Sequence, residues 1–118
     1  MSAGAEGPTY KLRFPFTGPG LSKYLMFTED GSLLIETEDY SRPYDERYTW
    51  LAPDDTFKFL ESIGEEGRQP EFADGEPTPQ TKAMLRRIMK QFSSIDDLRR
   101  CWKIIGVHSK TFNWTDRD

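Results

Sequence analysis

The chain contains one cysteine and one histidine among its 118 residues, and this scarcity excludes several kinds of site. A lone cysteine, Cys101, forms no internal disulfide, so we expect a reducing compartment, with the cytoplasm as the default location. A structural zinc site needs about four His or Cys ligands, so no metal site is expected. Cys101 and His108 are the one possible Cys–His catalytic pair, and the sequence fixes no carboxylate to orient the imidazole.

Long hydrophobic runs and phosphate-binding glycine loops are also missing. No apolar stretch reaches the roughly 18 to 20 residues needed to cross a bilayer, so we expect no membrane association. Gly18 and Gly20 flank a proline, and no Lys-Ser/Thr pair follows them at P-loop spacing. Carboxylates are plentiful, but no pattern marks one as shielded enough for acid–base catalysis. We therefore expect neither enzymatic activity nor a cofactor.

The composition is that of a globular domain, with 14% aromatic, 31% charged and 36% hydrophobic residues. Such a chain is too aromatic to be disordered, and its length suits one core. Residues 1–8 are small and polar and lack the basic and apolar regions of a secretory signal. We expect them to form a flexible segment before a single domain over residues 9–118.

Period-two alternation in the first half predicts β-strands. Residues 9–16 alternate apolar and polar side chains, which is typical of a half-buried strand. Two strand-like runs, 23–28 and 33–38, surround an Asp-Gly pair and make the strongest hairpin signal in the chain. Residues 48–51 predict a further short strand. The first half is therefore expected to be an antiparallel sheet.

Apolar residues recur at helical spacing in the second half. One helix is expected to begin at Asp54, with a carboxylate cap, and to end at Gly64. Two more are expected to begin at the capping hydroxyls of Thr78 and Ser94. Residues 65–77 show no periodicity and predict a long acidic loop. The element order predicts an α+β fold, with an antiparallel sheet of about three to five strands and about three helices on one face.

Residues 98–114 raise the question whether the chain reads DNA, because a helix ending at Gly106 is followed by a second amphipathic run. A helix-turn-helix needs a small residue four positions before the turn glycine, and Trp102 stands there. This stretch is at best a degenerate form of the motif. Residues 107–114 are compatible with a strand or a short helix, and we favour a strand with Phe112 and Trp114 packed on the core.

The formal net charge of −4 hides an asymmetry between the two parts of the chain. Residues 1–76 carry 7 basic and 16 acidic side chains, whereas residues 77–118 carry 9 basic and 4 acidic ones. Two interpretations stay open. Either the halves neutralise each other across one fold, or one of them offers a charged surface to a partner.

Recognition is expected mainly in residues 40–50, YSRPYDERYTW, where tyrosine, arginine and tryptophan are concentrated. These residue types most often anchor protein interfaces. Pro43 disfavours a helix, so we expect a loop or arm between strands. The acidic loop is the second candidate, with Phe72 as its apolar anchor. The candidate partner-binding residues are Tyr40, Arg42, Tyr44, Arg47, Tyr48, Glu65, Glu66, Glu71, Phe72 and Asp74.

The alternative is a nucleic-acid surface on the two C-terminal helices, which would bind phosphates without reading bases. Its residues are Lys82, Arg86, Arg87, Lys90, Arg99, Arg100 and Lys103. The competing interpretation is an ordinary solvated helix face, on which Asp96 and Asp97 pair with Arg99 and Arg100.

The sequence thus predicts a small non-catalytic protein that acts by binding another protein. The expected type is an inhibitor, an immunity or anti-defence protein, or an adaptor, which blocks its partner sterically or electrostatically. An acidic surface would suit a basic partner, such as a nucleic-acid enzyme or a toxin.

Overall fold

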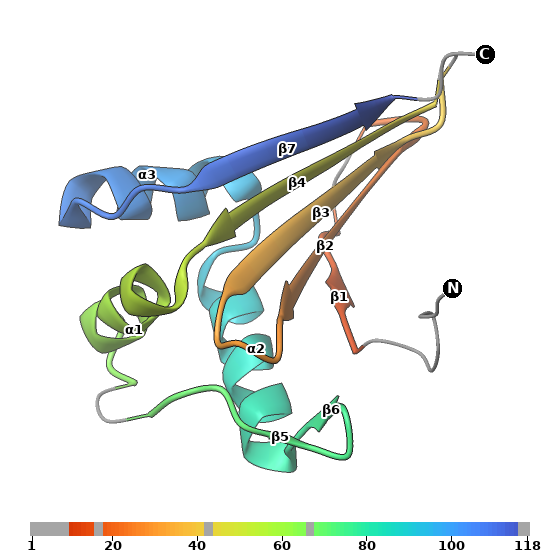
Figure 1. Cartoon of the computed structure of the whole chain (residues 1–118). Helices are drawn as coiled ribbons and strands as arrows, with labels where there is room; N and C mark the ends of the chain where they lie inside the picture. Colours follow the sequence, from red (N-terminus) through yellow and green to blue (C-terminus); the bar gives the residue numbers. More distant parts are fainter. Residues whose placement is uncertain (1–9, 16–17, 42–43, 66–67, 116–118) are drawn as a thin grey trace.

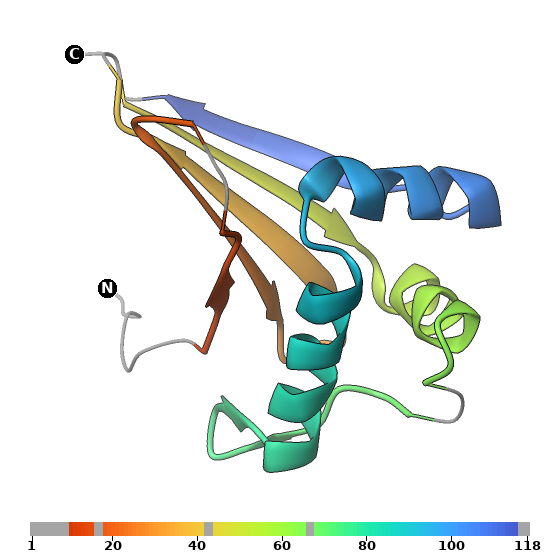
Figure 2. The ribbon, with the colours of Figure 1, turned by 180° about the vertical axis from the view of Figure 1, so that it is seen from behind.

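The predicted α+β fold is confirmed by a computed structural model, which describes residues 10–15, 18–41, 44–65 and 68–115. Five antiparallel strands pair in the order β1 (Leu12–Arg13), β2 (Leu21–Phe27), β3 (Leu33–Asp39), β4 (Asp45–Leu51) and β7 (Lys110–Thr115). The helices are α1 (Pro53–Ser62), α2 (Pro79–Gln91) and α3 (Ile95–Ile105). Strands of the sheet pass in front of α2 and α3 in Figure 1, α2 and α3 lie in front of strands in Figure 2, and α1 lies beyond the ends of β3 and β4 in both views. Helices α2 and α3 therefore cover one face of the sheet and leave the other open.

One hydrophobic core joins the sheet to the three helices. The ring of Phe59 on α1 lies 5.8 Å from the ring of Phe92, which follows α2, and 6.2 Å from that of Trp102 on α3. The hydroxyl of Thr56 is fully buried, accepts a hydrogen bond from Leu33 N–H and donates one to the carbonyl of Leu51, each at 3.0 Å. These bonds attach α1 to the neighbouring ends of β3 and β4. The buried core residues are Phe14, Leu25, Phe27, Leu33, Ile35, Leu51, Phe59, Leu60, Met84, Leu85, Ile88, Leu98, Trp102 and Val107.

The predicted caps of α2 and α3 are confirmed, whereas the predicted cap of α1 is wrong. Thr78 and Ser94 accept hydrogen bonds from backbone N–H groups in the first turns of their helices, at 3.3 and 3.1 Å. In α1 Pro53 occupies the first helical position, so the N-cap is Ala52, whose methyl side chain cannot accept a hydrogen bond. Asp54 instead lies in the first turn, where the positive end of the helix favours a carboxylate.

The interpretation of residues 65–77 as a loop without regular structure is also wrong in part. A small hairpin of β5 (Phe72–Ala73) and β6 (Glu76–Pro77) lies there. Its turn is Asp74-Gly75, with φ of 56° and 80°. Positive φ at both central residues is what an Asp-Gly turn of type I′ requires, so the signal was present in the sequence. The strand expected over 9–16 is also shorter, since only Leu12 and Arg13 pair in β1.

Strand β7 corrects two further expectations. Residues 110–115 pair with β4 along their whole length, so the second helix of the proposed helix-turn-helix at 98–114 does not exist. The last segment is a strand, as favoured, but Phe112 and Trp114 do not pack on the core. They are 56% and 47% exposed. The strand expected over residues 48–51 is confirmed, but it begins earlier, so residues 45–47, expected in an arm, belong to β4, which is paired on both sides by β3 and β7.

Candidate protein-binding surface

The open face of the sheet carries a concentration of aromatic side chains. Residues directly opposite each other in antiparallel strands point to the same face, and successive residues alternate between faces. Leu25 and Ile35 are paired and buried under the helices, so their neighbours Tyr24 and Glu36 point to the open side. We define the aromatic face as Tyr24, Tyr40, Tyr44, Tyr48, Trp50, Phe112 and Trp114, together with Glu36, Glu38 and Glu46.

The register of β4 and β7 brings together rings from distant parts of the sequence. Tyr48 is paired with Phe112, and their rings stack at a centroid distance of 6.5 Å. Tyr44 lies 6.2 Å from Trp114 in an edge-on arrangement and 5.6 Å from Tyr40. Such contacts hold the rings of neighbouring strands against one another on an open surface. A preorganised aromatic cluster loses little conformational entropy when it binds.

Carboxylates of the same face hold the tyrosine hydroxyls. Glu46 accepts hydrogen bonds from two of them, that of Tyr44 at 2.7 Å and that of Tyr48, while Glu38 accepts one from Tyr40. The hydrogen bond to Glu38 raises the pKa of Tyr40 to about 12. Desolvation, followed by the bond to Glu46, raises the pKa of both Tyr44 and Tyr48. All three hydroxyls therefore donate to carboxylates of the same face.

The aromatic face has an acidic centre and a basic margin. Lys11 from the segment before β1 forms an ion pair with Glu36 at 3.1 Å, and its ammonium lies 4.3 Å from the centre of the Tyr24 ring. No cation among the described residues forms an ion pair with Glu38 or Glu46. Within the described part of the chain, these two carboxylates thus carry negative charge that no ion pair compensates.

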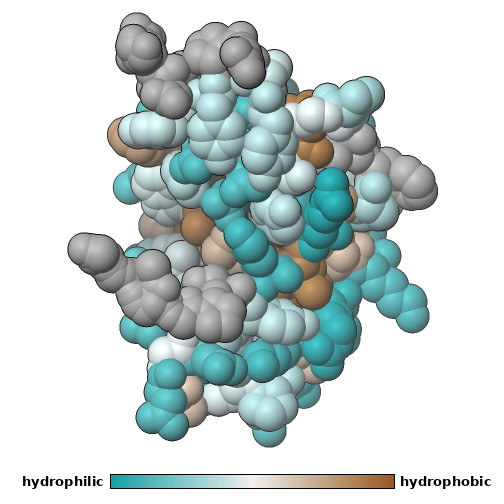
Figure 3. Space-filling view, turned by 90° about the vertical axis from the view of Figure 1, so that its right-hand side faces the viewer, coloured by the Kyte–Doolittle hydropathy of each residue, from teal (hydrophilic) through white to brown (hydrophobic). Residues whose placement is uncertain are grey.

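Most of the exposed large hydrophobic side chains in the described part of the chain lie on the aromatic face. The large hydrophobic side chains that stand exposed in the described part of the chain are Tyr40, Phe112 and Trp114 on the aromatic face, and Ile104 on α3. On the side of the molecule seen in Figure 3, hydrophobic surface occurs in small areas among hydrophilic and near-neutral side chains. On the aromatic face the exposed rings stand beside carboxylates, and a surface that mixes aromatic and polar side chains is typical of interfaces between proteins that also exist apart.

The structure brings together only part of the first predicted set. Tyr40, Tyr44 and Tyr48 share the aromatic face. Arg47 lies on the opposite side of β4, where its Nε donates to Asn113 Oδ1 at 3.2 Å. Arg42 lies outside the described residues, as does Glu66. Phe112 and Trp114 were missed as binding residues, although the alternation of aromatic and polar residues in 110–115 predicts that they share one face.

The acidic loop, the second predicted surface, does not form a single face. Glu65 is nearly buried and accepts two hydrogen bonds from Arg87, at 2.7 and 2.9 Å, which lower its pKa. Phe72 packs against the core, and Asp74 forms a turn. The backbone N–H of Glu71 donates to a threonine of α2 at 2.8 Å. Glu65 and Phe72 thus make contacts within the fold, and partner binding by this loop stays a prediction.

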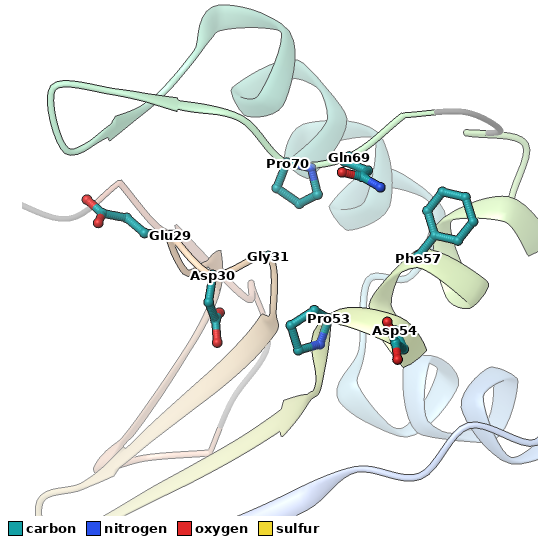
Figure 4. A pocket seen from close by; sticks show the side chains of 8 residues that line it. All are labelled: Glu29, Asp30, Gly31, Pro53, Asp54, Phe57, Gln69 and Pro70. Carbon is teal, nitrogen blue, oxygen red and sulfur yellow. The ribbon is translucent and has the colours of Figure 1, made fainter.

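An open cleft of about 520 Å³ lies beside this loop, and the carboxylates that line it do not point toward a common position (Figure 4). Its apolar surfaces come from Pro53, Phe57 and Pro70. Figure 4 shows that Glu29 and Asp30, which also line it, extend in different directions rather than toward a common point. Asp30 is held in its own turn by Thr28, and this bond lowers its pKa. The arrangement suits neither paired carboxylates for acid–base work nor a cation site.

The basic residues of α2 are mostly engaged within the fold. Arg87 is held by Glu65, and Arg86 donates to the hydroxyl of Tyr10 at 3.1 Å. Lys82 lies 3.6 Å from Glu76 and 5.0 Å from the centre of the Tyr10 ring. Lys90 is exposed. The pairs with Glu65 and Glu76 join the basic part of the chain to the acidic part, as the interpretation of mutual neutralisation expects.

The basic residues of α3 are arranged differently. Arg100 pairs with Asp97 at 2.9 Å, as its spacing predicts, whereas the expected pair of Arg99 with Asp96 is not found between these described side chains. Arg99, Arg100 and Lys103 line one cleft, and none of the four basic residues of α2 lines it.

Metal-binding clusters and membrane-spanning helices are both absent from the described residues. No group of three or more His, Cys, Asp or Glu side chains there could hold a metal ion, and no helix there is long and apolar enough to span a membrane. Cys101 is partly buried against the core, and burial raises the pKa of its thiol.

Comparisons with known proteins add no relative. No protein-family model, curated protein or solved structure matches this chain.

Proposed function

We propose that this chain is a non-catalytic protein that acts by binding another protein through the aromatic face. The observation that carries the proposal is that the sheet face left open by the helices gathers tyrosine, tryptophan and phenylalanine side chains from β2, β4, β7 and the segment between β3 and β4. An aromatic cluster of this kind is the usual centre of an interface. Its exposed rings contribute little to the core of this domain.

The chemistry of the face suits a partner with cationic side chains set in an apolar surface. Glu38 and Glu46 offer negative charge beside the rings, and Lys or Arg side chains stack well on tyrosine and tryptophan. A basic nucleic-acid enzyme or a toxin meets this description. The mode of action would be steric and electrostatic blocking in the manner of an inhibitor, immunity or anti-defence protein, and the single cysteine suits the cytoplasm.

Neighbouring residues of β4 supply a matched test, because Tyr48 and Arg47 point to opposite faces of the sheet. Tagged wild type, Tyr48→Ala and Arg47→Ala would be used to capture partners from the native host after nuclease treatment. A protein that binds through the aromatic face is retained by wild type and Arg47→Ala and is depleted with Tyr48→Ala. Far-ultraviolet circular dichroism confirms that each variant is folded.

The opposite pattern would contradict the proposal. Equal capture by Tyr48→Ala and wild type, or loss of the partner with Arg47→Ala alone, would move the binding site to the helix side of the sheet. Recovery of nucleic acid in place of a protein would favour the basic helices instead.

A further inference from the structure

A second candidate site lies in the helix layer, between α3 and the chain that leads from it into β7. It is an open cleft of about 640 Å³. Residues 96, 99, 100 and 103 follow one another at helical spacing and form one wall, and residues 106–109 form the other. A cleft of this size can hold a small organic ligand or a short stretch of polymer.

The lining is rich in hydrogen-bond donors that carry positive charge. The lining contains three cations, Arg99, Arg100 and Lys103, and one carboxylate, that of Asp96. His108 and Ser109 add further polar groups. The guanidinium of Arg100 is shared with Asp97 at 2.9 Å. Arg99 and Lys103 form no ion pair with any of the described carboxylates. Within a chain of net charge −4, this cleft is a local site of opposite sign.

The indole of Trp102 provides an independent observation. Trp102 lines the cleft, is 2% exposed, and its Nε1–H is buried with no acceptor among the described residues. Buried N–H groups nearly always have an acceptor, which is a protein group, an ordered water or a ligand. The unsatisfied indole N–H is therefore an unexplained feature of a residue that lines the cleft.

We propose that this cleft binds a phosphate group. The guanidinium and ammonium groups of Arg99, Arg100 and Lys103 and the hydroxyl of Ser109 can donate to several oxygens of one tetrahedral anion, and arginine matches phosphate geometry in particular. The volume of the cleft leaves room for the organic part of the ligand. The phosphate would come from a small organic phosphate or from the backbone of a nucleic-acid strand. This site is separate from the aromatic face and does not depend on the proposed protein partner.

The test uses the indole N–H signals of the full-length protein in nitrogen-15 NMR spectra. The chain has three tryptophans, so Trp50→Phe and Trp114→Phe variants identify the Trp102 signal without altering the cleft. The protein is titrated with sodium phosphate, with sodium chloride at equal ionic strength as the reference. We expect a saturable shift of the Trp102 signal with phosphate and no saturation with chloride.

Two double variants with the same change of charge distinguish a site from general attraction. Arg99→Ala/Lys103→Ala removes two donors of the cleft, and its affinity for phosphate should fall about tenfold or more. Lys58→Ala/Lys90→Ala removes two exposed cations outside it and should leave the affinity unchanged. A shift that follows ionic strength alone, or an affinity retained after Arg99→Ala/Lys103→Ala, would overturn the proposal.

The source of the phosphate is decided by two further titrations, with adenosine monophosphate and with a single-stranded oligonucleotide. Tighter binding of the oligonucleotide at the same signal, with affinity that falls steeply as salt increases, identifies a nucleic-acid strand. Binding of the mononucleotide in the absence of oligonucleotide binding identifies a small phosphate compound. Failure of both to shift the Trp102 signal would overturn the inference and leave the aromatic face unaffected.

Discussion

Replacement of Phe112 by alanine tests whether the aromatic face is required for the stability of the fold. The side chain is 56% exposed, so folding buries less than half of it. Complete burial of a phenylalanine contributes about 1.5 to 3 kcal/mol, which leaves about 1 kcal/mol here. The stack with Tyr48 adds about 0.5 to 1 kcal/mol. Phe112→Ala should therefore reduce the free energy of unfolding by about 1 to 2 kcal/mol.

Phe59→Ala is the matched control, because Phe59 is 0% exposed and contacts Phe92 and Trp102. Its loss should cost about 3 to 5 kcal/mol, since it leaves a cavity in the core. Urea unfolding of both variants, followed by tryptophan fluorescence, gives the two values. Equal losses would mean that Phe112 is a core residue, and the argument that these rings serve recognition would fail.

Three further predictions concern the elements that hold the sheet and the loop in place. Thr56→Val should cost about 2 to 4 kcal/mol in urea unfolding, more than Thr56→Ser, because it leaves the buried N–H of Leu33 without an acceptor. Glu65→Gln should cost about 1 to 3 kcal/mol at pH 7. The folded-state pKa of Glu65 is below its ordinary 4.5, so this stabilisation is present above pH 4.5 and is lost as the pH falls. The difference in the free energy of unfolding between wild type and Glu65→Gln should therefore shrink in acid, and a difference that stays constant would contradict the role of Arg87. Gly75→Ala should cost about 1 to 2 kcal/mol through strain at φ 80°, and an unchanged thermal midpoint would argue against this turn.

Local signals predicted the helices and the central hairpin well. Thr78 and Ser94 cap their helices because a hydroxyl before a helical pattern satisfies N–H groups of the first turn, and this chemistry is local. Gly64 adopts a left-handed φ of 93°, as a glycine after a helix is expected to do. The Asp-Gly turn at residue 75 was equally local, but the apparent lack of periodicity in the acidic loop obscured it.

The surface formed by β4 and β7 could not be predicted in the same way. Alternation in residues 110–115 separates Phe112 and Trp114 from Thr111 and Asn113, but it does not say which set points toward the helices. The pairing decides it, since Thr49 is buried on the core side and lies opposite Thr111, with their hydroxyl oxygens 3.4 Å apart. Because this pairing joins residues more than sixty positions apart, only the fold reveals that the C-terminal rings meet the tyrosines of 40–48.

The contribution of the Glu38 and Glu46 charges to partner binding can be measured separately from that of the aromatic rings. Glu38→Gln/Glu46→Gln retains acceptors for the tyrosine hydroxyls and removes both charges. For a cationic partner, affinity should fall and should depend less on salt concentration than that of wild type. An unchanged salt dependence, measured by calorimetry, would mean that these carboxylates serve only to position the rings.

The most direct test of the aromatic face is the affinity of the purified partner for a variant that lacks two rings in mutual contact. Tyr44→Ala/Trp114→Ala removes such a pair, and Ile104→Ala removes the exposed hydrophobic residue of α3 as the control. Isothermal titration calorimetry should show a loss of at least about thirtyfold for the double variant and no loss for the control. Wild-type affinity in a folded Tyr44→Ala/Trp114→Ala variant would contradict the proposal that this face binds the partner.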